Sequence, residues 1–180
     1  MPGLDLSRSF VPVRIGVLTV SDTRALADDR SGDSLVQRLE AAGHVLADRA
    51  IVPDDIASIQ ERVRAWIAEP TIDVVLVTGG TGVTGRDVTP EALLPLFEKE
   101  IPGFGELFRW QSYAKIGTST IQSRATAGVA NGTYLFALPG STGACIDAWE
   151  GILVHQLDSR LRPCNFVEMM PRLREHVRGG

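Results

Sequence analysis

The chain has 180 residues, of which 44% are apolar and 22% are charged, the mixture of one soluble globular domain and not of a disordered chain. Its 18 basic and 22 acidic residues give a net charge of −4, so there is no basic excess for binding nucleic acid through bulk electrostatics. Two cysteines and three histidines, without metal-ligand spacing, argue against a structural zinc site and against a disulfide framework.

The N-terminal region predicts a short extension followed by a buried strand. Residues 13–20 (VRIGVLTV) are β-branched and almost continuously apolar, which is typical of a strand covered on both faces in a parallel sheet. No small-residue cleavage pattern follows this stretch, and no run reaches the ~18 apolar residues of a membrane helix. We therefore expect residues 1–12 to be an extension, and the protein to be cytoplasmic and without a membrane partner.

The next elements along the chain alternate between helix and strand. Ser31 is expected to cap a helix over about 32–42, and Gly43 stands where a glycine would end it. Residues 45–52 favour a second strand. Asp54 then begins an amphipathic helix, for which it is a natural N-cap.

The middle of the chain contains a third strand and a long glycine-rich loop. Residues 72–77 (IDVVLV) have the pattern of a buried strand, and the loop 78–87 follows it. The TPE sequence at 89–91 predicts the start of a helix, with an N-cap, a first-turn proline and an acid. We expect another helix over about 104–115, whereas residues 116–132 favour neither element.

The last strand is expected at 133–138, after the Asn-Gly turn signal at 131–132. A second glycine loop, PGSTG, leads into a helix over about 142–158. Strands that alternate with helices predict an α/β fold, here a three-layer α/β/α sandwich with a mostly parallel sheet. We assign this domain to residues 13–160 and a C-terminal tail to residues 161–180.

Three loops leave the carboxyl ends of the predicted strands, where open α/β sheets bind their ligands. They are Ser21–Thr23, Gly79–Asp87 and Pro139–Gly143, and the last two are rich in glycine and precede helices. Glycine allows close approach to an anion, and a helix N-terminus offers free N–H groups. Tight turns alone would account for either loop by itself, but the two together favour a ligand that carries phosphate groups.

Two known motifs fit the first glycine loop only superficially. Gly80, Gly82 and Gly85 match G-x-G-x-x-G, but the predicted helix starts later, at Pro90, and no acid ends a strand about 20 residues on. A nicotinamide dehydrogenase is therefore rejected. The stretch is not a P-loop either, because Arg-Asp stands at 86–87 where Lys and Ser or Thr are required.

The acids near these loops indicate a bound cation. A carboxylate at Asp87 would repel a neighbouring phosphate unless Mg²⁺ lay between them, and Mg²⁺ binds one or two carboxylates together with substrate oxygens. The alternative for Asp87 is a turn residue or an ion pair with Arg86, and the alternative for Asp54 is a helix cap. Ser123 and Arg124 are candidate phosphate ligands, although surface salt bridges are a common role for such arginines.

Several segments together resemble the MogA/MoaB family of molybdenum-cofactor biosynthesis proteins, over about residues 14–166. The ending LDSRLRPCNF is similar to the MoaB branch, as is PGST, where many adenylyltransferases of the family have PG-x-P. The segments that carry the resemblance are VLTVSDTR at 17–24, SG at 31–32, VPDD at 52–55, TGGTGVTGRDVTPEA at 78–92, SRATAG at 123–128 and LPGSTGAC at 138–145.

The resemblance implies a molybdopterin-binding α/β domain and a reaction. The reaction is adenylyl transfer from Mg-ATP to the terminal phosphate of molybdopterin, which gives adenylylated molybdopterin and pyrophosphate. Asp54 and Asp87 match the family's two catalytic, metal-associated acids. The positions that match its nucleotide and pterin loops are Ser21, Asp22, Gly79, Gly80, Thr81, Gly82, Pro139, Gly140 and Ser141.

Some members of the MoaB branch have lost the acids and are thought not to catalyse, so a non-catalytic molybdopterin-binding or scaffold protein is the alternative. This sequence retains Asp54 and Asp87, which favours an enzyme with small-molecule substrates. The resemblance also implies a homo-oligomer, a trimer or hexamer. Trp149 and Phe166 are apolar residues that one small domain would leave uncovered, which points the same way.

Overall fold

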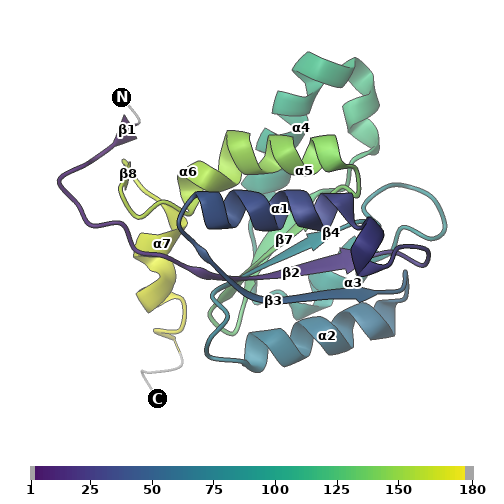
Figure 1. Cartoon of the computed structure of the whole chain (residues 1–180), viewed down its shortest axis with the longest axis horizontal. Coiled ribbons are helices and arrows are strands. Elements are labelled where there is room, and N and C mark those ends of the chain that lie inside the picture. The colour runs from purple at the N-terminus through teal and green to yellow at the C-terminus, as the bar shows by residue number, and fades with distance from the viewer. Residues whose placement is uncertain (1–2, 177–180) are drawn as a thin grey trace.

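The computed structural model describes residues 3–176 and contains a six-stranded sheet in the order β3-β2-β4-β7-β6-β5 (Figure 1). Strands β3, β2, β4 and β7 are parallel, β6 runs antiparallel to β7, and β5 antiparallel to β6. The sheet is therefore mostly parallel, as expected. Its strands are β2 (Arg14–Val20), β3 (Val45–Val52), β4 (Val74–Thr78), β5 (Lys99–Glu100), β6 (Thr126–Ala130) and β7 (Thr133–Leu138).

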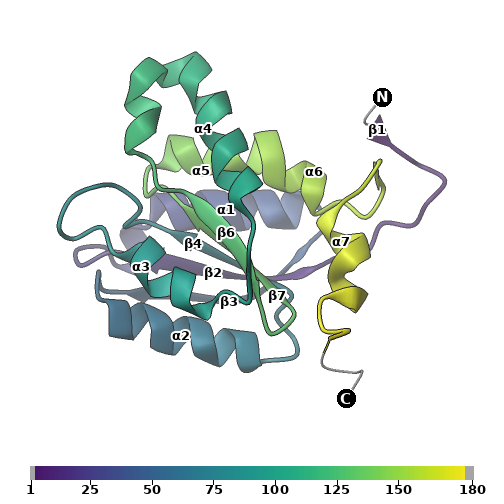
Figure 2. The ribbon, with the colours of Figure 1, turned by 180° about the vertical axis from the view of Figure 1, so that it is seen from behind.

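Helices cover both faces of this sheet, which confirms the three-layer sandwich (Figures 1 and 2). On one face lie α1 (Arg30–Ala41), α4 (Pro102–Ile116), α5 (Thr142–Ala148) and α6 (Val154–Gln156); on the other lie α2 (Ile56–Ala68) and α3 (Thr89–Leu93). A π-helical turn, Trp149–Leu153, joins α5 to α6. Short 3₁₀ turns are η1 (Leu26–Asp28), η2 (Leu94–Leu96), η3 (Gly117–Gln122) and η5 (Met170–Arg172).

The core consists of two apolar layers, one on each side of the sheet. All five residues of β4 are buried, and they alternate between the layers. Leu76 packs with the cluster under α1 and α5, whereas Val75 and Val77 pack with the cluster that contains Ile59 of α2. The continuous apolar run in β4 thus reflects burial on both faces.

Helix α1 begins two residues earlier than the sequence indicates. Its N-cap is Asp29, not Ser31, because the Asp29 Oδ1 accepts a hydrogen bond of 3.0 Å from the Gly32 N–H. Gly43 follows the helix with φ +89°, the left-handed conformation that glycine adopts without strain. The expected glycine end of this helix is therefore confirmed.

Two further expected caps are wrong. Asp55, not Asp54, caps α2, since its carboxylate accepts from the Ser58 N–H at 2.8 Å. Thr89 is already the first residue of α3, and its hydroxyl donates to the Gly79 carbonyl at 2.7 Å. The side chains of Asp54 and Thr89 are therefore free to contact the loops at the carboxyl ends of the strands.

The ambiguous segment 116–132 forms η3 and then β6, which pairs with β7 in a hairpin. Asn131 (φ +49°) and Gly132 (φ +83°) form the turn, so the Asn-Gly signal is confirmed. In the C-terminal region β8 (Leu161–Arg162) pairs with β1 (Gly3–Leu4), and α7 (Phe166–Met169) follows. Figure 1 shows β1 and β8 side by side at the edge of the molecule, near α7.

Trp149 and Phe166 do not form an uncovered apolar surface. Trp149 is 2% exposed and belongs to the core, and Phe166 packs against that core and contacts Tyr134. The expectation that a partner must cover these two residues is therefore wrong. Among residues 3–176, no helix has both the length and the apolar character needed to cross a membrane.

Candidate functional site

A cavity of about 550 Å³ lies where β4 and β7 end, between their glycine loops and the α4–η3 segment. The sequence predicts much of one side of it. Of the residues expected at the site, the cavity wall contains Gly80, Thr81, Gly82, Asp87, Ser123, Pro139, Gly140 and Ser141. The loop after β4 and the loop after β7 thus meet at one ligand-sized space, as the fold class requires.

The first glycine loop needs its glycines because of backbone geometry. Gly79 has φ +106°, and a Cβ there would lie 2.3 Å from the Val20 carbonyl oxygen. Gly80 has φ +64°, and its carbonyl accepts from the Thr89 N–H at 2.9 Å. These positions pack the loop tightly against β2 and α3, so its shape is fixed before any ligand binds.

Asp87 is an ionised carboxylate on the cavity wall. Its Oδ2 accepts from the Thr84 N–H at 2.8 Å and from the Thr84 hydroxyl at 2.7 Å. Burial acts to raise the pKa of Asp87, but the Thr84 bonds, the Gly82 N–H and the charge of Arg124 outweigh it and lower the pKa. The ion pair that we considered for Asp87 does not form, because Arg86 pairs with Asp22 instead.

Arg124 forms hydrogen bonds with the glycine loop from outside the cavity. Its guanidinium donates to the Gly82 carbonyl and to the Asp87 carbonyl, both at 2.6 Å, and pairs with Glu91. Its own N–H donates to the Thr81 carbonyl at 2.9 Å. Arg124 therefore supports the loop and does not line the cavity, whereas Ser123 does line it.

Asp22 and Asp54 hold the neighbouring loops together by a reciprocal pair of bonds. The Asp22 N–H donates to the Asp54 Oδ2, and the Asp54 N–H donates to the Asp22 Oδ1, both at 3.0 Å. Ser21 stays within its own loop, where its hydroxyl accepts from the Arg24 N–H at 3.2 Å. None of these three expected site residues lines the cavity, nor does Gly79. Asp54 nevertheless stands close behind the loop, since a Cβ on Gly80 would lie 3.4 Å from its Oδ1.

The donors present suit Mg²⁺ only together with a ligand. Within the part of the chain that the structure describes, no three His, Cys, Asp or Glu side chains are grouped so that they could hold a metal ion. Mg²⁺ needs just one or two carboxylates when phosphate oxygens and water complete its shell. Asp87, which is ionised and lies beside Gly82, fits that role, with Asp54 as a second carboxylate behind Gly80.

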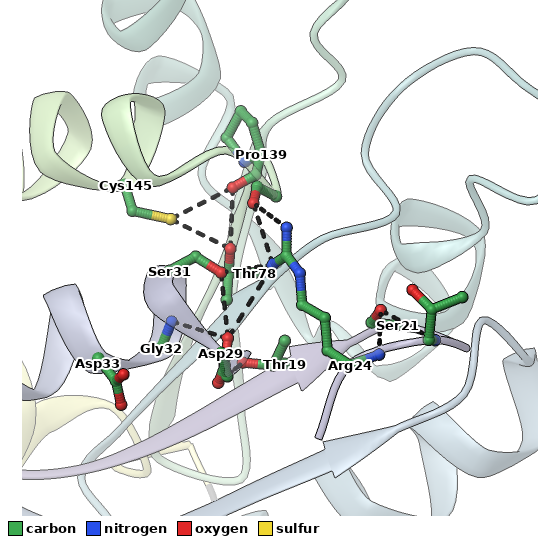
Figure 3. Close-up of polar contacts among 12 residues, drawn as sticks. Thr19, Ser21, Arg24, Asp29, Ser31, Gly32, Asp33, Thr78, Pro139 and Cys145 are labelled. Carbon is green, nitrogen blue, oxygen red and sulfur yellow. Dashed lines mark hydrogen bonds and ion pairs between the residues drawn. The ribbon is translucent and has the colours of Figure 1, made fainter. Parts of the chain in front are cut away.

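Below the site lies a buried polar network around Asp29 (Figure 3). The carboxylate is fully buried and accepts from the Thr19 hydroxyl at 2.7 Å and from the Arg49 Nη2 at 2.9 Å. Burial acts to raise the pKa of Asp29, but the bonds from Arg49, Thr19 and the Gly32 N–H prevail and lower it. Asp29 is therefore a stable anion in the interior.

Arg24 connects this network to the second glycine loop. It donates to the Ser31 hydroxyl at 2.7 Å and to the Gly140 carbonyl at 3.3 Å (Figure 3). Ser31 in turn donates to Asp29 at 3.2 Å. The position of the PGST loop thus depends on a charge that is buried at the start of α1.

Cys145 is a structural residue of the same loop. Its Sγ lies 3.1 Å from the Thr78 hydroxyl oxygen and 3.3 Å from the Pro139 carbonyl oxygen. Burial raises the pKa of the thiol to about 11, so it is protonated at neutral pH. This thiol is therefore unsuited to nucleophilic catalysis.

Sequence reasoning missed the opposite wall of the cavity. No motif marks this wall, and the density of Ser and Thr at 117–123 was its only signal. Lys115 also forms an ion pair with Asp147 at this side of the cavity. The missed residues of this wall are Phe108, Ser112, Lys115, Ile116, Ser119, Thr120 and Gln122, and Ala144 and Asp147 of α5 were missed as well.

Known proteins of the same kind match nearly the whole chain. Residues 16–159 match the family described as "Probable molybdopterin binding domain". The molybdenum cofactor biosynthesis protein B of Escherichia coli (strain K12) is 56% identical over 161 residues, which cover 89% of this chain and 95% of the relative.

Solved structures agree with these sequence matches. A crystal structure of a molybdenum cofactor biosynthesis protein B superimposes with a TM-score of 0.84 at 40% identity, covering 93% of this chain and 99% of the other. The tungsten cofactor synthesizing protein MoaB from Pyrococcus furiosus gives a TM-score of 0.76 at 35% identity, with 91% and 98% covered. With the fold and the two glycine loops described above, these matches show that the chain belongs to the MogA/MoaB family of molybdenum cofactor biosynthesis proteins.

Proposed function

We propose that the protein transfers the adenylyl group of Mg-ATP to the terminal phosphate of molybdopterin. The observation that carries this proposal is the ionised carboxylate of Asp87, which faces a ligand-sized cavity beside the backbone of Gly80–Gly82. A carboxylate at a phosphate-binding loop suits metal-assisted transfer better than simple anion binding, since alone it would repel the ligand.

The transfer needs alignment and charge neutralisation more than covalent chemistry by the protein. A phosphate oxygen of molybdopterin attacks the α-phosphorus of ATP, a new P–O bond forms, and the bond to the bridging oxygen breaks to release pyrophosphate. Backbone N–H groups of the glycine loop would bind the phosphates, and Asp87, together with Asp54 behind Gly80, would hold Mg²⁺. When bound, Mg²⁺ supplies positive charge that offsets the charge building up on the phosphate oxygens.

One observation favours the alternative, a molybdopterin-binding protein without catalytic activity. Asp54, the second acid expected in catalysis, is engaged by the Asp22 N–H and does not line the cavity. A binding role would need only the glycine loops and the cavity.

Single-turnover formation of adenylylated molybdopterin separates the two functions. The Asp87→Asn variant keeps the shape of the side chain but removes its charge, so turnover should fall by about two orders of magnitude or more while molybdopterin affinity stays equal or rises. Asp73→Asn is the matched control, because Asp73 pairs with Arg14 at the opposite end of the strands. Wild-type turnover in Asp87→Asn would contradict the mechanism, and a wild type that binds molybdopterin without turnover would establish the alternative.

We also propose that the protein is a homo-oligomer and acts in the cytoplasm, where ATP is available. The support for an oligomer lies on the α4–η3 segment, where Trp110 is 75% exposed, Tyr113 59% and Ile121 77%. Large apolar side chains gathered on one segment are typical of an interface, and closed symmetry is the common solution. Light scattering at micromolar concentration should give a multiple of the 19.4 kDa chain mass, and Trp110→Ser should lower that multiple. A monomeric wild type would refute the proposal.

A further inference from the structure

We propose that Lys115 is the side chain that recognises a phosphate group of the ligand, and that it exchanges Asp147 for this phosphate when the ligand binds. The inference rests on the proposed function to the extent that the ligands of the cavity carry phosphates. It concerns the α4–η3 wall, opposite the glycine loops that sequence reasoning identified.

The cavity wall has few charged side chains. Three charged side chains line it in the described chain, Asp87, Asp147 and Lys115, so Lys115 is the sole cation. While Lys115 pairs with Asp147, the remaining charge is that of Asp87, and the wall is negative. Mg²⁺ held at Asp87 would supply positive charge beside the glycine loop, whereas on the opposite wall Lys115 is the one side chain that can supply it to an anionic ligand.

The Lys115–Asp147 pair is easily exchanged. The Lys115 side chain is 66% exposed, and ion pairs between exposed groups contribute little to stability. A phosphate carries up to two negative charges and several acceptor oxygens, whereas the ammonium group offers three donors on a flexible stem. The phosphate is thus the stronger partner for Lys115.

Asp147 can lose its partner without being left as a buried, unpaired charge. Its side chain is 26% exposed and also lines a second cavity of about 420 Å³, between α4 and the π-helical turn. Figure 2 shows α4 rising above the layer that α1 and α5 form. The carboxylate therefore remains hydrated after the exchange, and the usual penalty for breaking a buried pair does not apply.

Hydroxyl groups complete the anion-binding character of this wall. Ser112 lies three residues before Lys115 on α4, and Ser119 follows four residues later on η3; both line the cavity. Lysine combined with serine hydroxyls can donate several hydrogen bonds to one phosphate. Such a wall would hold one anionic group while the glycine loop holds another, which suits a reaction between two phosphate-bearing molecules.

The composition of the chain makes the inference directly testable, because Lys99 and Lys115 are its only lysines. Reductive methylation with ¹³C-formaldehyde labels both, and each then gives its own methyl signal in NMR. The signal of Lys115 should shift on titration with Mg-ATP, with molybdopterin, or with both, and the responding ligand identifies the source of the phosphate. The signal of Lys99, which is exposed on β5 and does not line the cavity, should stay in place.

A mutant cycle measured by calorimetry tests the exchange itself. Lys115→Met should weaken binding of the responding ligand by about tenfold or more, whereas Lys99→Met should leave it unchanged. Asp147→Asn should tighten binding, because Lys115 no longer has a competing partner. In the Lys115→Met background that gain should disappear.

The inference is overturned if both lysine signals respond alike or neither responds, if Lys115→Met binds as tightly as wild type, or if the gain from Asp147→Asn persists without Lys115. A wild type that binds molybdopterin with a shift at Lys115 but forms no adenylylated product would refute the proposed reaction and still support the role of Lys115.

Discussion

Removing the buried charge of Asp29 should destabilise the fold strongly. In the Asp29→Asn variant an amide NH₂ replaces one carboxylate oxygen of nearly the same size, so packing is preserved. That oxygen accepts from Arg49 at 2.9 Å and from the Thr19 hydroxyl at 2.7 Å. The new amide would point a donor at the guanidinium donor, while the Thr19 hydroxyl can rotate to accept.

The expected loss follows from what remains around Arg49. Removing one member of a buried ion pair costs about 3–5 kcal/mol, but Arg49 is partly exposed and keeps its bond to Asp33 at 2.7 Å. We therefore expect the lower end of that range, about 3 kcal/mol. Asp33→Asn removes the other partner of the same arginine, and because Asp33 is 48% exposed its loss should cost at most about 1 kcal/mol.

Urea denaturation of the two variants measures this difference. The Asp29→Asn midpoint should fall well below that of Asp33→Asn with an unchanged slope, since the same surface is exposed on unfolding. Equal midpoints would show that the buried carboxylate contributes no more than an exposed one and would refute the reasoning. A weakened hold of Arg24 on Gly140 should also lower ligand affinity in Asp29→Asn, but not in Asp33→Asn.

Two further predictions concern His44 and Gly79. Burial lowers the pKa of His44 against the opposing influence of Asp158, and its Nδ1 accepts from the Val13 N–H at 3.3 Å. Below about pH 6.5 the unfolded chain therefore binds a proton at His44 that the folded chain resists. As the pH falls through this range, the free energy of unfolding should decrease by up to about 1.4 kcal/mol per pH unit. His44→Gln should flatten the profile of urea midpoints between pH 7.5 and 5.5, and an unchanged profile would contradict this. Gly79→Ala should lower the free energy of unfolding by about 3 kcal/mol or more, because φ at Gly79 is +106° and the new Cβ would lie 2.3 Å from the Val20 carbonyl oxygen. Gly85→Ala is the control, because a Cβ there has nothing within 4 Å and should change the thermal midpoint little. Similar midpoints for the two variants would refute the predicted strain.

The strands and the order of layers were predictable because their signals are local. A largely β-branched, uninterrupted apolar run such as residues 74–77 is compatible with few structures other than a strand buried on both faces. The glycine loops were predictable for the same reason, since the chemistry of a strand-to-helix turn is written in adjacent residues. Burial at 116–132, by contrast, depends on pairing with a strand later in the chain.

The parts that the sequence did not reveal depend on contacts between distant segments. Asp29 rather than Ser31 caps α1 because Arg49, from β3, stabilises the carboxylate there. The α4–η3 wall faces the glycine loops only once β6 has paired with β7. Lys115 and Asp147 are 32 residues apart and carry no motif, so only the packing of α4 on α5 brings them together.

The insertion of β7 between β4 and β6 has a consequence for synthesis on the ribosome. Strand β4 ends at residue 78, but its neighbour on that side is complete only at residue 138, about 60 residues later. At roughly 5–20 residues per second, the edge of a fully buried strand stays open in the nascent chain for about 3–12 s. Open apolar edges pair readily with other chains. The emerging polypeptide therefore has a defined window in which a chaperone would protect it from aggregation, and the ligand cavity, whose lining extends to Asp147, forms only after that window has closed.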